Sequence, residues 1–327
     1  MTYPIGEGTY GSVYRPPLRS KQKRYNKLYR NNNYVMKVST EESIYSERQI
    51  AKILHKIDPN NKFFIYIIPV KKADIVDNIK TIQSQVVNTD PNKEYYGYYM
   101  KYGGQTLDNY IRKNEGNISI ELIWKWLSKL IKALNLLYQH KIVHLDVKLT
   151  NIVIDDNNDI RLIDFSLSNM ITNDDEHNKN MLIDEYYSVY PLFFNILHQK
   201  VSDLNLYYNH LTNNKSYLKN VITKLNDEIE DIDLYMDTIL IPNIHKIDVF
   251  GIGYIFMEVI YKNFKDQFKK DNLFLSDHLK RISLHMIDPN PDSQFNILQC
   301  LNYQNVIIKI NNINLNRCIK NIIWKYC

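Results

Sequence analysis

The sequence has few cysteines and no long apolar run. Its three cysteines, Cys300, Cys318 and Cys327, lie near the C-terminal end, and none has the CxxC or Cys/His spacing of a metal site. An odd number of cysteines without a secretion signal favours a reducing compartment. The first residues, MTYPIGEGTYG, contain no apolar signal region, and no apolar stretch is long enough to cross a bilayer. The sequence therefore predicts a soluble intracellular protein without a membrane segment.

The chain also lacks a strong excess of charge. Its formal net charge is +5 over 327 residues, which is too small to indicate a nucleic-acid partner. Asn and Ile together make up roughly a quarter of the residues, far above ordinary usage. Because Asn, Ile, Lys and Tyr have AT-rich codons, genomic bias explains this better than a prion-like tract. The stretch from Arg15 to Arg30 contains no acidic residue. It predicts a solvated loop, with an acidic partner or an anionic surface as the alternative.

The first hundred residues indicate a sheet and one helix. Aromatic and β-branched content predicts strands in residues 2–15, 34–38, 62–70 and 94–102, with a Gly-rich turn inside the first segment. Residues 39–57 predict a helix that is capped by Ser39, with Glu42 three positions later as in a capping box. One face of this helix is apolar, through Ile44, Ile50, Ile53, Leu54 and Ile57.

Helical patterns dominate the rest of the chain. Residues 119–140 predict a strongly amphipathic helix, and residues 245–264 predict a second, almost wholly apolar helix. Short strands are expected at 141–144, 151–154 and 160–165. The change from sheet to helix near Tyr102 predicts two parts, residues 1–102 and 103–327, and no internal repeat is present.

A glycine motif opens the chain. Gly6, Gly8 and Gly11 form G-x-G-x-x-G, with Val13 two residues further on. Glycines let backbone N–H groups approach phosphates closely, although a turn without a ligand has the same pattern. A dinucleotide-binding fingerprint needs a helix after the third glycine, whereas SVYR reads as a strand. The motif therefore favours a β-hairpin over phosphates.

Lys37 ends the apolar run YVMKV and precedes the predicted helix that carries Glu47. A lone lysine there is usually a solvated edge residue. Pairing with Glu47, which borders the apolar face of the helix, would instead fix the ammonium for phosphate oxygens. Glu41 and Glu42 are rival partners, but residues in the first turn are better explained by capping and by the helix dipole.

Four polar residues interrupt apolar runs in HLDVKLTNIVIDDNNDIRLIDFS. They are Asp146, Lys148, Asn151 and Asp164. Burying such groups without partners costs several kcal/mol. They must therefore satisfy one another, as a structural cluster would, or hold something charged.

In chain order, these motifs resemble the eukaryotic-type protein kinase family. GEGTYGSV resembles its Gly-rich loop, VMK its β3 lysine motif, HLDVKLTN its catalytic loop, DFS its D-F-G and DVFGIG its helix-F motif. The resemblance implies an α+β, bilobal fold. Residues 1–102 would form a small antiparallel-sheet lobe with one helix, and residues 103–327 a larger, mainly helical lobe.

The resemblance also implies roles for individual residues. Asp146 would accept the proton of the substrate hydroxyl, and Lys148 would neutralise the transferred phosphoryl group. Asn151 and Asp164 would hold Mg²⁺ or Mn²⁺ against the ATP phosphates. The remaining ATP contacts would be the Gly-rich loop (Gly6, Glu7, Gly8, Thr9, Tyr10, Gly11), the Lys37–Glu47 pair, Val13, Val35 and Val153 around adenine, and a hinge at Met100–Tyr102.

Several positions depart from the family pattern. Leu145 replaces the Arg that pairs with a phosphate on the activation segment, residues 166–191 here, which predicts activity without a priming phosphate. Ser166 replaces the Gly of D-F-G. The A-P-E motif is degraded around Leu192, and Gln294 stands where its partner Arg is expected. Both members of a buried ion pair are thus lost together, which avoids one unpaired buried charge.

Residues 195–240 form an insert that reads as one or two helices, either a solvated structural insert or a docking site for a substrate or partner. The insert, the lost ion pair and the composition resemble Ser/Thr kinases of giant DNA viruses, the mimivirus group. That origin would place the protein in the host cytoplasm or in the virion. The function that these features predict is ATP-dependent phosphorylation of Ser/Thr in proteins. A pseudokinase scaffold and a small-molecule phosphotransferase are the alternatives.

Overall fold

The computed structural model describes residues 3–8, 11–17, 33–68, 95–173, 176–179, 190–195, 215–229 and 231–312. Thr9 and Tyr10 of the Gly-rich motif, most of the basic stretch, and residues 196–214 of the insert lie outside these ranges. The chain divides into two compact units. The first comprises residues 1–110 and 144–170, and the second comprises residues 111–143 and 171–327. The lobe boundary near Tyr102 stays a prediction.

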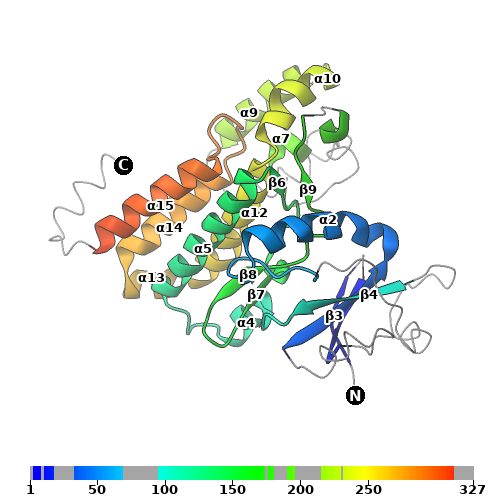
Figure 1. Ribbon diagram of the computed structural model, residues 1–327. Helices are drawn as coiled ribbons and strands as arrows, with labels where there is room; N and C mark the ends of the chain where they lie inside the picture. The colour runs from blue at the N-terminus through cyan, green and yellow to red at the C-terminus, as the bar shows by residue number, and fades with distance from the viewer. Residues whose placement is uncertain are drawn as a thin grey trace. The chain divides into compact units, whose positions relative to one another are not determined.

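An antiparallel sheet of four strands forms much of the first unit (Figure 1). The strands are β1 (Tyr3–Gly8), β2 (Gly11–Arg15), β3 (Tyr34–Thr40) and β4 (Tyr95–Lys101), hydrogen-bonded in that order. Gly8 lies opposite Gly11, and Glu7 lies opposite Ser12. The Gly-rich motif is therefore a β-hairpin, as its sequence predicts.

Helix α2 (Glu41–Ile57) follows β3 without a linker. Ile50 and Leu54 are buried, as the apolar pattern predicts. The predicted N-cap at Ser39 is wrong, because Ser39 continues β3 opposite Tyr96 and its side chain is buried. Pairing along the sheet has taken the residue that the capping pattern assigned to the helix.

A second, three-stranded sheet in the first unit carries the polar segment. Its strands are β5 (Gln105–Thr106), β7 (Ile152–Ile154) and β8 (Ile160–Leu162). The short strand β9 (Asn169–Met170) comes later in the chain and is not part of this sheet. The strand predicted over 62–70 does not form as one element in its described part. Phe64 bridges Leu162 of the second sheet, whereas Ile67 bridges Met100 of the first. The segment crosses from one sheet to the other and so pairs regularly with neither.

Helices build the described part of the second unit (Figure 1). Their bounds, with those of the short elements between them, are α4 (Leu107–Lys113, shared with the first unit), α5 (Ile120–Gln139), β6 (Ile142–Val143), α7 (Leu192–Asn195), α9 (Lys215–Glu228), α10 (Ile232–Tyr235), η4 (Met236–Leu240), α11 (Ile241–Asn243), α12 (Lys246–Tyr254), η5 (Ile255–Tyr261), α13 (Lys262–Asp271), α14 (Leu273–Met286) and α15 (Ile297–Asn312). A 3₁₀ turn, η2 (Leu149–Asn151), precedes β7 in the first unit. The α+β fold class predicted from the sequence is confirmed.

Helix α5 is central to the second unit and contacts α12, α14 and α15. Ser119 caps it by accepting a hydrogen bond from the Leu122 N–H at 3.3 Å. The Trp124 indole donates to the carbonyl of Leu275 at 2.8 Å, so even the polar atom of this large buried ring has a partner. Polar bonds of this kind fix how the helices meet, because apolar contact alone has no direction.

Gln294 occupies the position where the family pattern expects an arginine. Its amide donates to the carbonyl of Lys246 at 3.1 Å and to the carbonyl of Met286 at 2.7 Å, and the side chain is buried. Leu192, near the degraded A-P-E motif, is fully buried. A neutral donor with carbonyl acceptors needs no carboxylate, so the paired loss predicted from the sequence is physically coherent.

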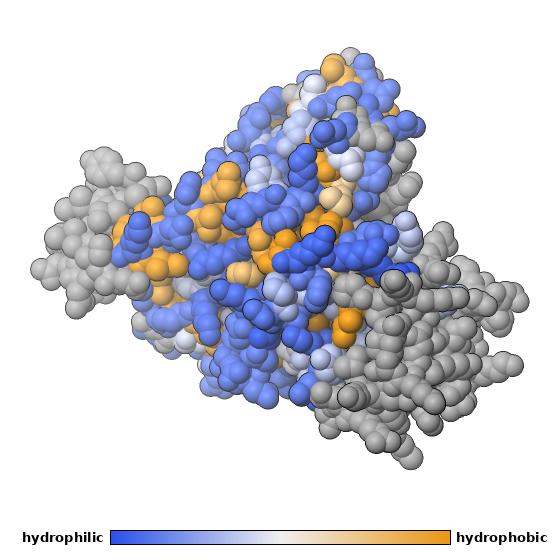
Figure 2. Space-filling model, in the orientation of Figure 1, coloured by the Kyte–Doolittle hydropathy of each residue, from blue (hydrophilic) through white to orange (hydrophobic). Residues whose placement is uncertain are grey.

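Among the described residues, no single helix is long and apolar enough to cross a membrane. One bent pair, Ile232–Asn243 with Lys246–Met257, meets the length and composition criteria only when taken together. Figure 2 shows polar residues over most of the described surface on the face that it draws, with apolar residues between them.

Two glycines with positive φ allow a matched test of backbone packing. Gly104 has φ +102°, and a Cβ there would lie 1.9 Å from the carbonyl oxygen of Ile154. Gly116 has φ +78° with nothing within 4 Å of such a Cβ. We expect Gly116→Ala to cost about 1–2 kcal/mol from left-handed strain alone. Gly104→Ala adds a clash with the backbone. Urea unfolding should therefore show that the free energy of unfolding falls by at least about twice as much as in Gly116→Ala, or that no folded protein forms. Equal losses would contradict this packing.

Candidate functional site

Lys37 lies between two carboxylates. Its Nζ is 2.7 Å from Oε2 of Glu47 and 2.7 Å from Oδ1 of Asp164. The three residues come from β3, from α2 and from the loop after β8. Lys37 and Glu47 are buried, whereas the Asp164 side chain is 36% exposed. The Lys37–Glu47 pair that the sequence favoured is therefore present, and Asp164 joins it.

The charges of this triangle do not balance. Burial alone would lower the pKa of Lys37, but the carboxylates of Glu47 and Asp164 outweigh burial and raise it. Burial raises the pKa of Glu47, against the opposing effect of Lys37. Burial would also raise the pKa of Asp164, but the Lys37 ammonium lowers it to about 2. One ammonium faces two carboxylates, and the more exposed carboxylate is the one held ionised. The excess negative charge around Asp164 therefore favours the binding of a further cation there.

Backbone hydrogen bonds hold Asp164 close to the catalytic-loop motif. The N–H of Ile163 donates to the carbonyl of Asn151 at 2.9 Å, and the carbonyl of Ile163 lies 3.0 Å from Nε2 of His144. Asp164 itself has φ +64°, a left-handed conformation that Asp adopts more readily than most residues. The loop after β8 is thereby fastened on both sides immediately before the carboxylate.

His144 connects the two polar motifs. Its Nδ1 accepts the N–H of Asp146 at 3.3 Å, so its Nε2 carries the proton donated to Ile163. The ring packs edge-on against Phe165, with centroids 4.8 Å apart, and Phe165 packs edge-on against Phe64 at 5.7 Å. Hydrogen bonds and aromatic contacts together fix where Asp146 and Asp164 lie relative to each other.

Asp146, Lys148 and Asn151 form a compact polar cluster. Oδ2 of Asp146 accepts from the Asn151 amide at 2.7 Å and lies 2.8 Å from Nζ of Lys148. The same amide donates to the Asp146 carbonyl at 3.0 Å. Oδ1 of Asp146 is buried and has no hydrogen-bond partner among the described residues. An unpaired buried acceptor is unfavourable by about 1–3 kcal/mol, and a hydroxyl donor from outside the chain would satisfy it.

The donor set fits a hard divalent cation. Asn151 uses its amide nitrogen within the cluster, which leaves the amide oxygen to act as a ligand. Asp164 offers an ionised and partly exposed carboxylate. Mg²⁺ prefers such oxygen ligands and commonly uses only one or two from protein together with phosphate oxygens. In the described part of the chain, no group of three or more His, Cys, Asp or Glu side chains could hold a metal by itself.

An apolar cluster in the first unit contains the residues predicted around adenine. Val35, Met100 and Val153 are buried together with Ile65, and Val13, Tyr102 and Ile163 pack against them. The sequence analysis missed Ile65 and Ile163. Both stand in runs of Ile, Leu, Phe and Tyr, where the pattern indicates burial but not which neighbours are met. Val13 lies opposite Gly6, so the Gly-rich hairpin adjoins this cluster.

Tyr102 contributes its ring to the cluster rather than its amide. Its backbone N–H donates to the carbonyl of Asn33 at 2.7 Å, so this N–H is not available to adenine. The guanidinium of Arg15 lies 3.5 Å from the centroid of the Tyr102 ring, a cation–π contact. A Cβ at Gly103 would lie 2.3 Å from Ile65 and 2.5 Å from Val153. A larger residue at this position would require the side chains of Ile65 and Val153 to shift.

The other predicted positions are placed as follows. Gly6, Glu7 and Gly8 lie in β1 and Gly11 in β2, while Thr9 and Tyr10 are outside the described residues. Leu145 is buried with φ +64°. Asp248, of the predicted helix-F motif, is buried in the first turn of α12. The chemical roles of the site residues stay predictions.

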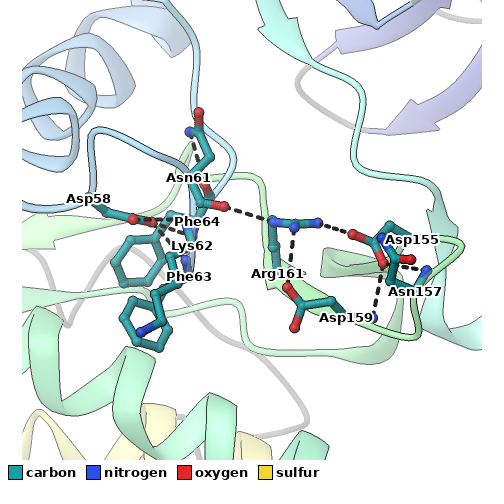
Figure 3. A network of polar contacts seen from close by, with 9 residues as sticks. All are labelled: Asp58, Asn61, Lys62, Phe63, Phe64, Asp155, Asn157, Asp159 and Arg161. Carbon is teal, nitrogen blue, oxygen red and sulfur yellow. Dashed lines mark hydrogen bonds and ion pairs between the residues drawn. The ribbon is translucent and has the colours of Figure 1, made fainter.

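A polar network braces the loop that follows α2 (Figure 3). The buried carboxylate of Asp58 accepts the backbone N–H groups of Lys62, Phe63 and Phe64 at 2.7–2.9 Å. Asn61, with φ +56°, donates its amide to the carbonyl of Phe64 at 3.0 Å. These bonds fix a tight turn directly after the helix that carries Glu47.

Arg161, on β8, joins this turn to the β7–β8 turn (Figure 3). Its Nε donates to the carbonyl of Asn61 at 2.8 Å, and its terminal nitrogens donate to Asp155 at 2.9 Å and to Asp159 at 3.2 Å. Asp164 follows Arg161 by three residues. One guanidinium therefore ties the end of α2 to the strand that leads to Asp164.

The ion triangle predicts a change in titration. In Lys37→Met, burial still raises the pKa of Asp164 but the ammonium that lowers it is gone, so its pKa should rise from about 2 to above the ordinary 3.8. ¹³C NMR of the Asp carboxyl carbons should show Asp164 titrating between pH 3 and 5 in the variant only. In the wild-type protein, the Lys37–Asp164 pair stabilises the folded state fully at pH values above the pKa of Asp164 in the unfolded chain. This stabilisation is lost as the pH falls toward about 2, the pKa of Asp164 in the folded protein. An unchanged Asp164 titration would contradict the triangle.

The Arg161 network predicts a loss of stability. Arg161→Met keeps much of the aliphatic length but removes three donors to the Asn61 carbonyl and the two carboxylates. We expect urea unfolding to report a loss of roughly 1.5–3 kcal/mol, the range for hydrogen bonds to charged groups. Lys132→Met, at an exposed position on α5, is the control and should change stability by less than about 0.5 kcal/mol. Equal effects of the two substitutions would show that the network contributes nothing.

Comparison with known proteins agrees with this geometry. The dual specificity protein kinase zakA of Dictyostelium discoideum is 26% identical over 167 residues, which are 50% of this chain and 18% of that protein. Protein kinase kin1 of Schizosaccharomyces pombe is 39% identical over 77 residues, 22% of this chain and 8% of that protein. The serine/threonine-protein kinase Nek3 of Oryza sativa subsp. japonica is 37% identical over 73 residues, 22% of this chain and 12% of that protein.

The chain thus spans less than a fifth of the length of each of these relatives. In the family comparison, residues 2–189 match the protein kinase domain. That match exceeds half of the 327 residues and contains the Gly-rich hairpin, the Lys37 triangle and the Asp146 cluster. The chain belongs to the protein kinase domain family.

Proposed function

We propose that this protein transfers the γ-phosphoryl group of ATP to Ser or Thr hydroxyls of protein substrates, with Mg²⁺ or Mn²⁺. The observation that carries the proposal is Lys37, buried and bound to both Glu47 and Asp164. A fixed ammonium beside an ionised, partly exposed carboxylate is what binding of a metal–triphosphate requires. Phosphoryl transfer depends mainly on positioning and electrostatics, and the polar groups described above are held in place by hydrogen bonds.

The chain's own groups divide the work. Lys37 would bind phosphate oxygens, and Asn151 with Asp164 would ligate the cation, which neutralises charge on the phosphates. Asp146 would orient the substrate hydroxyl and take its proton at Oδ1, the oxygen that has no partner among the described residues. Lys148, 45% exposed and close to Oδ2 of Asp146, would reach the transferred group. The apolar cluster around Val35 and Val153 would hold the adenine ring and exclude water.

Specificity for Ser/Thr rests on Lys148, two residues after Asp146, and on the names of relatives such as the serine/threonine-protein kinase Nek3. Because zakA is named a dual specificity protein kinase, Tyr should be tested as a further acceptor. Viral origin is supported by composition, the insert and the lost ion pair alone. A docking role for the basic stretch 15–30 or for the insert is likewise a proposal that rests on sequence.

The direct test is incubation with labelled ATP, Mg²⁺ and mixed protein substrates, followed by phosphoamino-acid analysis. We expect phosphoserine and phosphothreonine. Asp164→Ala should abolish transfer, and Asp146→Asn should lower kcat by on the order of 10²-fold or more while leaving the Kd for ATP nearly unchanged. Asp146 does not hold nucleotide in this scheme, so kcat and affinity should separate.

Asp156→Asn, at an exposed carboxylate in the β7–β8 turn, is the matched control and should keep normal turnover. Near-normal turnover in a folded Asp164→Ala protein would refute the assignment. ATP binding without transfer to any substrate would favour the pseudokinase alternative. Label on a small molecule but not on protein would favour the small-molecule phosphotransferase.

A further inference from the structure

The insert touches the segment that follows the metal-binding motif at two places. Nζ of Lys179 lies 2.9 Å from Oδ1 of Asp237 and 3.6 Å from Oδ1 of Asp233. The hydroxyl of Tyr235 donates to the carbonyl of Phe193 at 2.8 Å. Lys179 lies within the activation segment and Phe193 just after it. The three insert residues all come from the continuous stretch 231–240, in α10 and η4, and all five residues lie in the second unit.

The helical geometry of the insert explains why one short stretch makes both contacts. Asp233 and Asp237 are four residues apart, so they share one face of the helix, whereas Tyr235 points to the other side. Two carboxylates at this spacing repel each other, and a cation between them removes that penalty. Asp237 accordingly raises the pKa of Lys179.

The Tyr235 side of the contact is buried. Tyr235 is 1% exposed, and Leu192 and Phe193 of α7 are fully buried. Helix α7 contacts η4, the stretch that continues α10 (Figure 1). The α10 turn is itself fixed, because the Asp231 carboxylate caps it by accepting the N–H of Leu234 at 3.0 Å.

The segment also holds itself together beside Lys179. Asn178 is buried, accepts the N–H of Thr172 at 3.1 Å and donates to the carbonyl of Thr172 at 2.9 Å. The N–H of Ile171 donates to the carbonyl of Lys141 at 2.7 Å. Two hydrogen bonds therefore join Thr172 to Asn178. Lys179 directly follows Asn178 and is the cation that contacts the insert.

We propose that Lys179, Asp233, Asp237 and Tyr235 are positioning residues that hold the activation segment against the insert without phosphorylation. This inference rests on the proposed kinase function. Where an activation segment is ordered by a phosphate, the segment carries the anion and an arginine elsewhere carries the cation. Here the segment carries the cation and the insert carries the anions. Leu145 occupies the position where the family would supply that arginine.

Charge reversal tests the pair. Lys179→Glu places a third carboxylate beside Asp233 and Asp237. We expect kcat to fall on the order of three- to ten-fold, with the KM for ATP nearly unchanged, because Lys37 and Asp164 are untouched. Asp237→Lys should have a similar effect, and the double variant Lys179→Glu/Asp237→Lys should regain most of the activity. Lys224→Glu, which reverses one exposed member of the Lys224–Asp292 pair in the same unit, is the matched control and should leave kcat unchanged.

Tyr235→Phe tests the buried contact, since it removes the hydroxyl and keeps the ring. We expect a two- to ten-fold fall in kcat, the range for one buried hydrogen bond. Hydrogen exchange of residues 171–179 and 190–195 is the readout that does not depend on turnover. Exchange should accelerate in Lys179→Glu and in Tyr235→Phe, and should return toward normal in the charge-swapped double variant.

The outcomes separate this inference from the proposed function. Faster exchange in the variants of a protein that transfers no phosphoryl group would support the contacts and refute the kinase proposal. An active protein in which charge reversal changes neither kcat nor exchange would refute the contacts. If Lys179→Glu does not fold, Lys179→Met is measured by the same two criteria. Phosphatase treatment should leave wild-type activity within about two-fold. A ten-fold loss that is restored by rephosphorylating residues 166–191 would overturn the inference.

Discussion

The site depends on one buried ammonium that two carboxylates share. Lys37 bonds to Glu47, ten residues later in the chain, and to Asp164, 127 residues later. It therefore joins β3, α2 and the loop after β8 at a single point. Glu47 is screened from water and must be neutralised by Lys37, since an unpaired buried charge is strongly destabilising. The negative charge left over stays on Asp164, the more exposed carboxylate, where phosphate-bound metal would be ligated.

A charge arrangement of this kind requires a rigid frame, because Coulomb energy changes steeply with distance. The frame is built mainly from backbone groups. The N–H of Ile65 donates to the carbonyl of Leu162 at 2.9 Å, and the N–H of Leu162 donates to the carbonyl of Phe63 at 3.0 Å. Arg161 and Asp58 reinforce the same junction with charged side chains. The end of α2 and the strand before Asp164 are thus held as one piece.

Elsewhere the chain differs from the kinase family pattern in its ionic contacts. Some are replaced by neutral contacts, and in one the cation and the anion have exchanged places. Gln294 donates to two carbonyls at a buried position where an arginine is expected, which removes the need to desolvate an ion pair. Leu145 fills the catalytic-loop position of another expected arginine with buried apolar surface. The Lys179–Asp237 contact places the cation on the activation segment. These changes are consistent with a fold that orders the segment through its own side chains and through the insert.

The sequence by itself determined the local structure and the identity of the polar site residues. Apolar periodicity placed the helix at 119–140, observed as Ile120–Gln139, and glycine spacing placed the hairpin around Gly8 and Gly11. Lys37, Asp146, Asn151 and Asp164 could be singled out by two signals. Each is a polar group that interrupts an otherwise apolar run, and the motifs that contain them occur in the family's order. These signals are readable because they depend on residues a few positions apart.

Only the tertiary structure decided the contacts between distant segments. It placed Ser39 in β3 rather than at a helix cap, and it divided the described part of the predicted strand, residues 62–68, between two sheets. It brought Ile65 and Ile163 into the apolar cluster, Arg161 to the carbonyl of Asn61, and Lys179 to Asp237. Local patterns indicate whether a residue is buried or solvated, but its partner depends on how the whole chain packs. Burial is a property of one position, whereas a contact is a property of two.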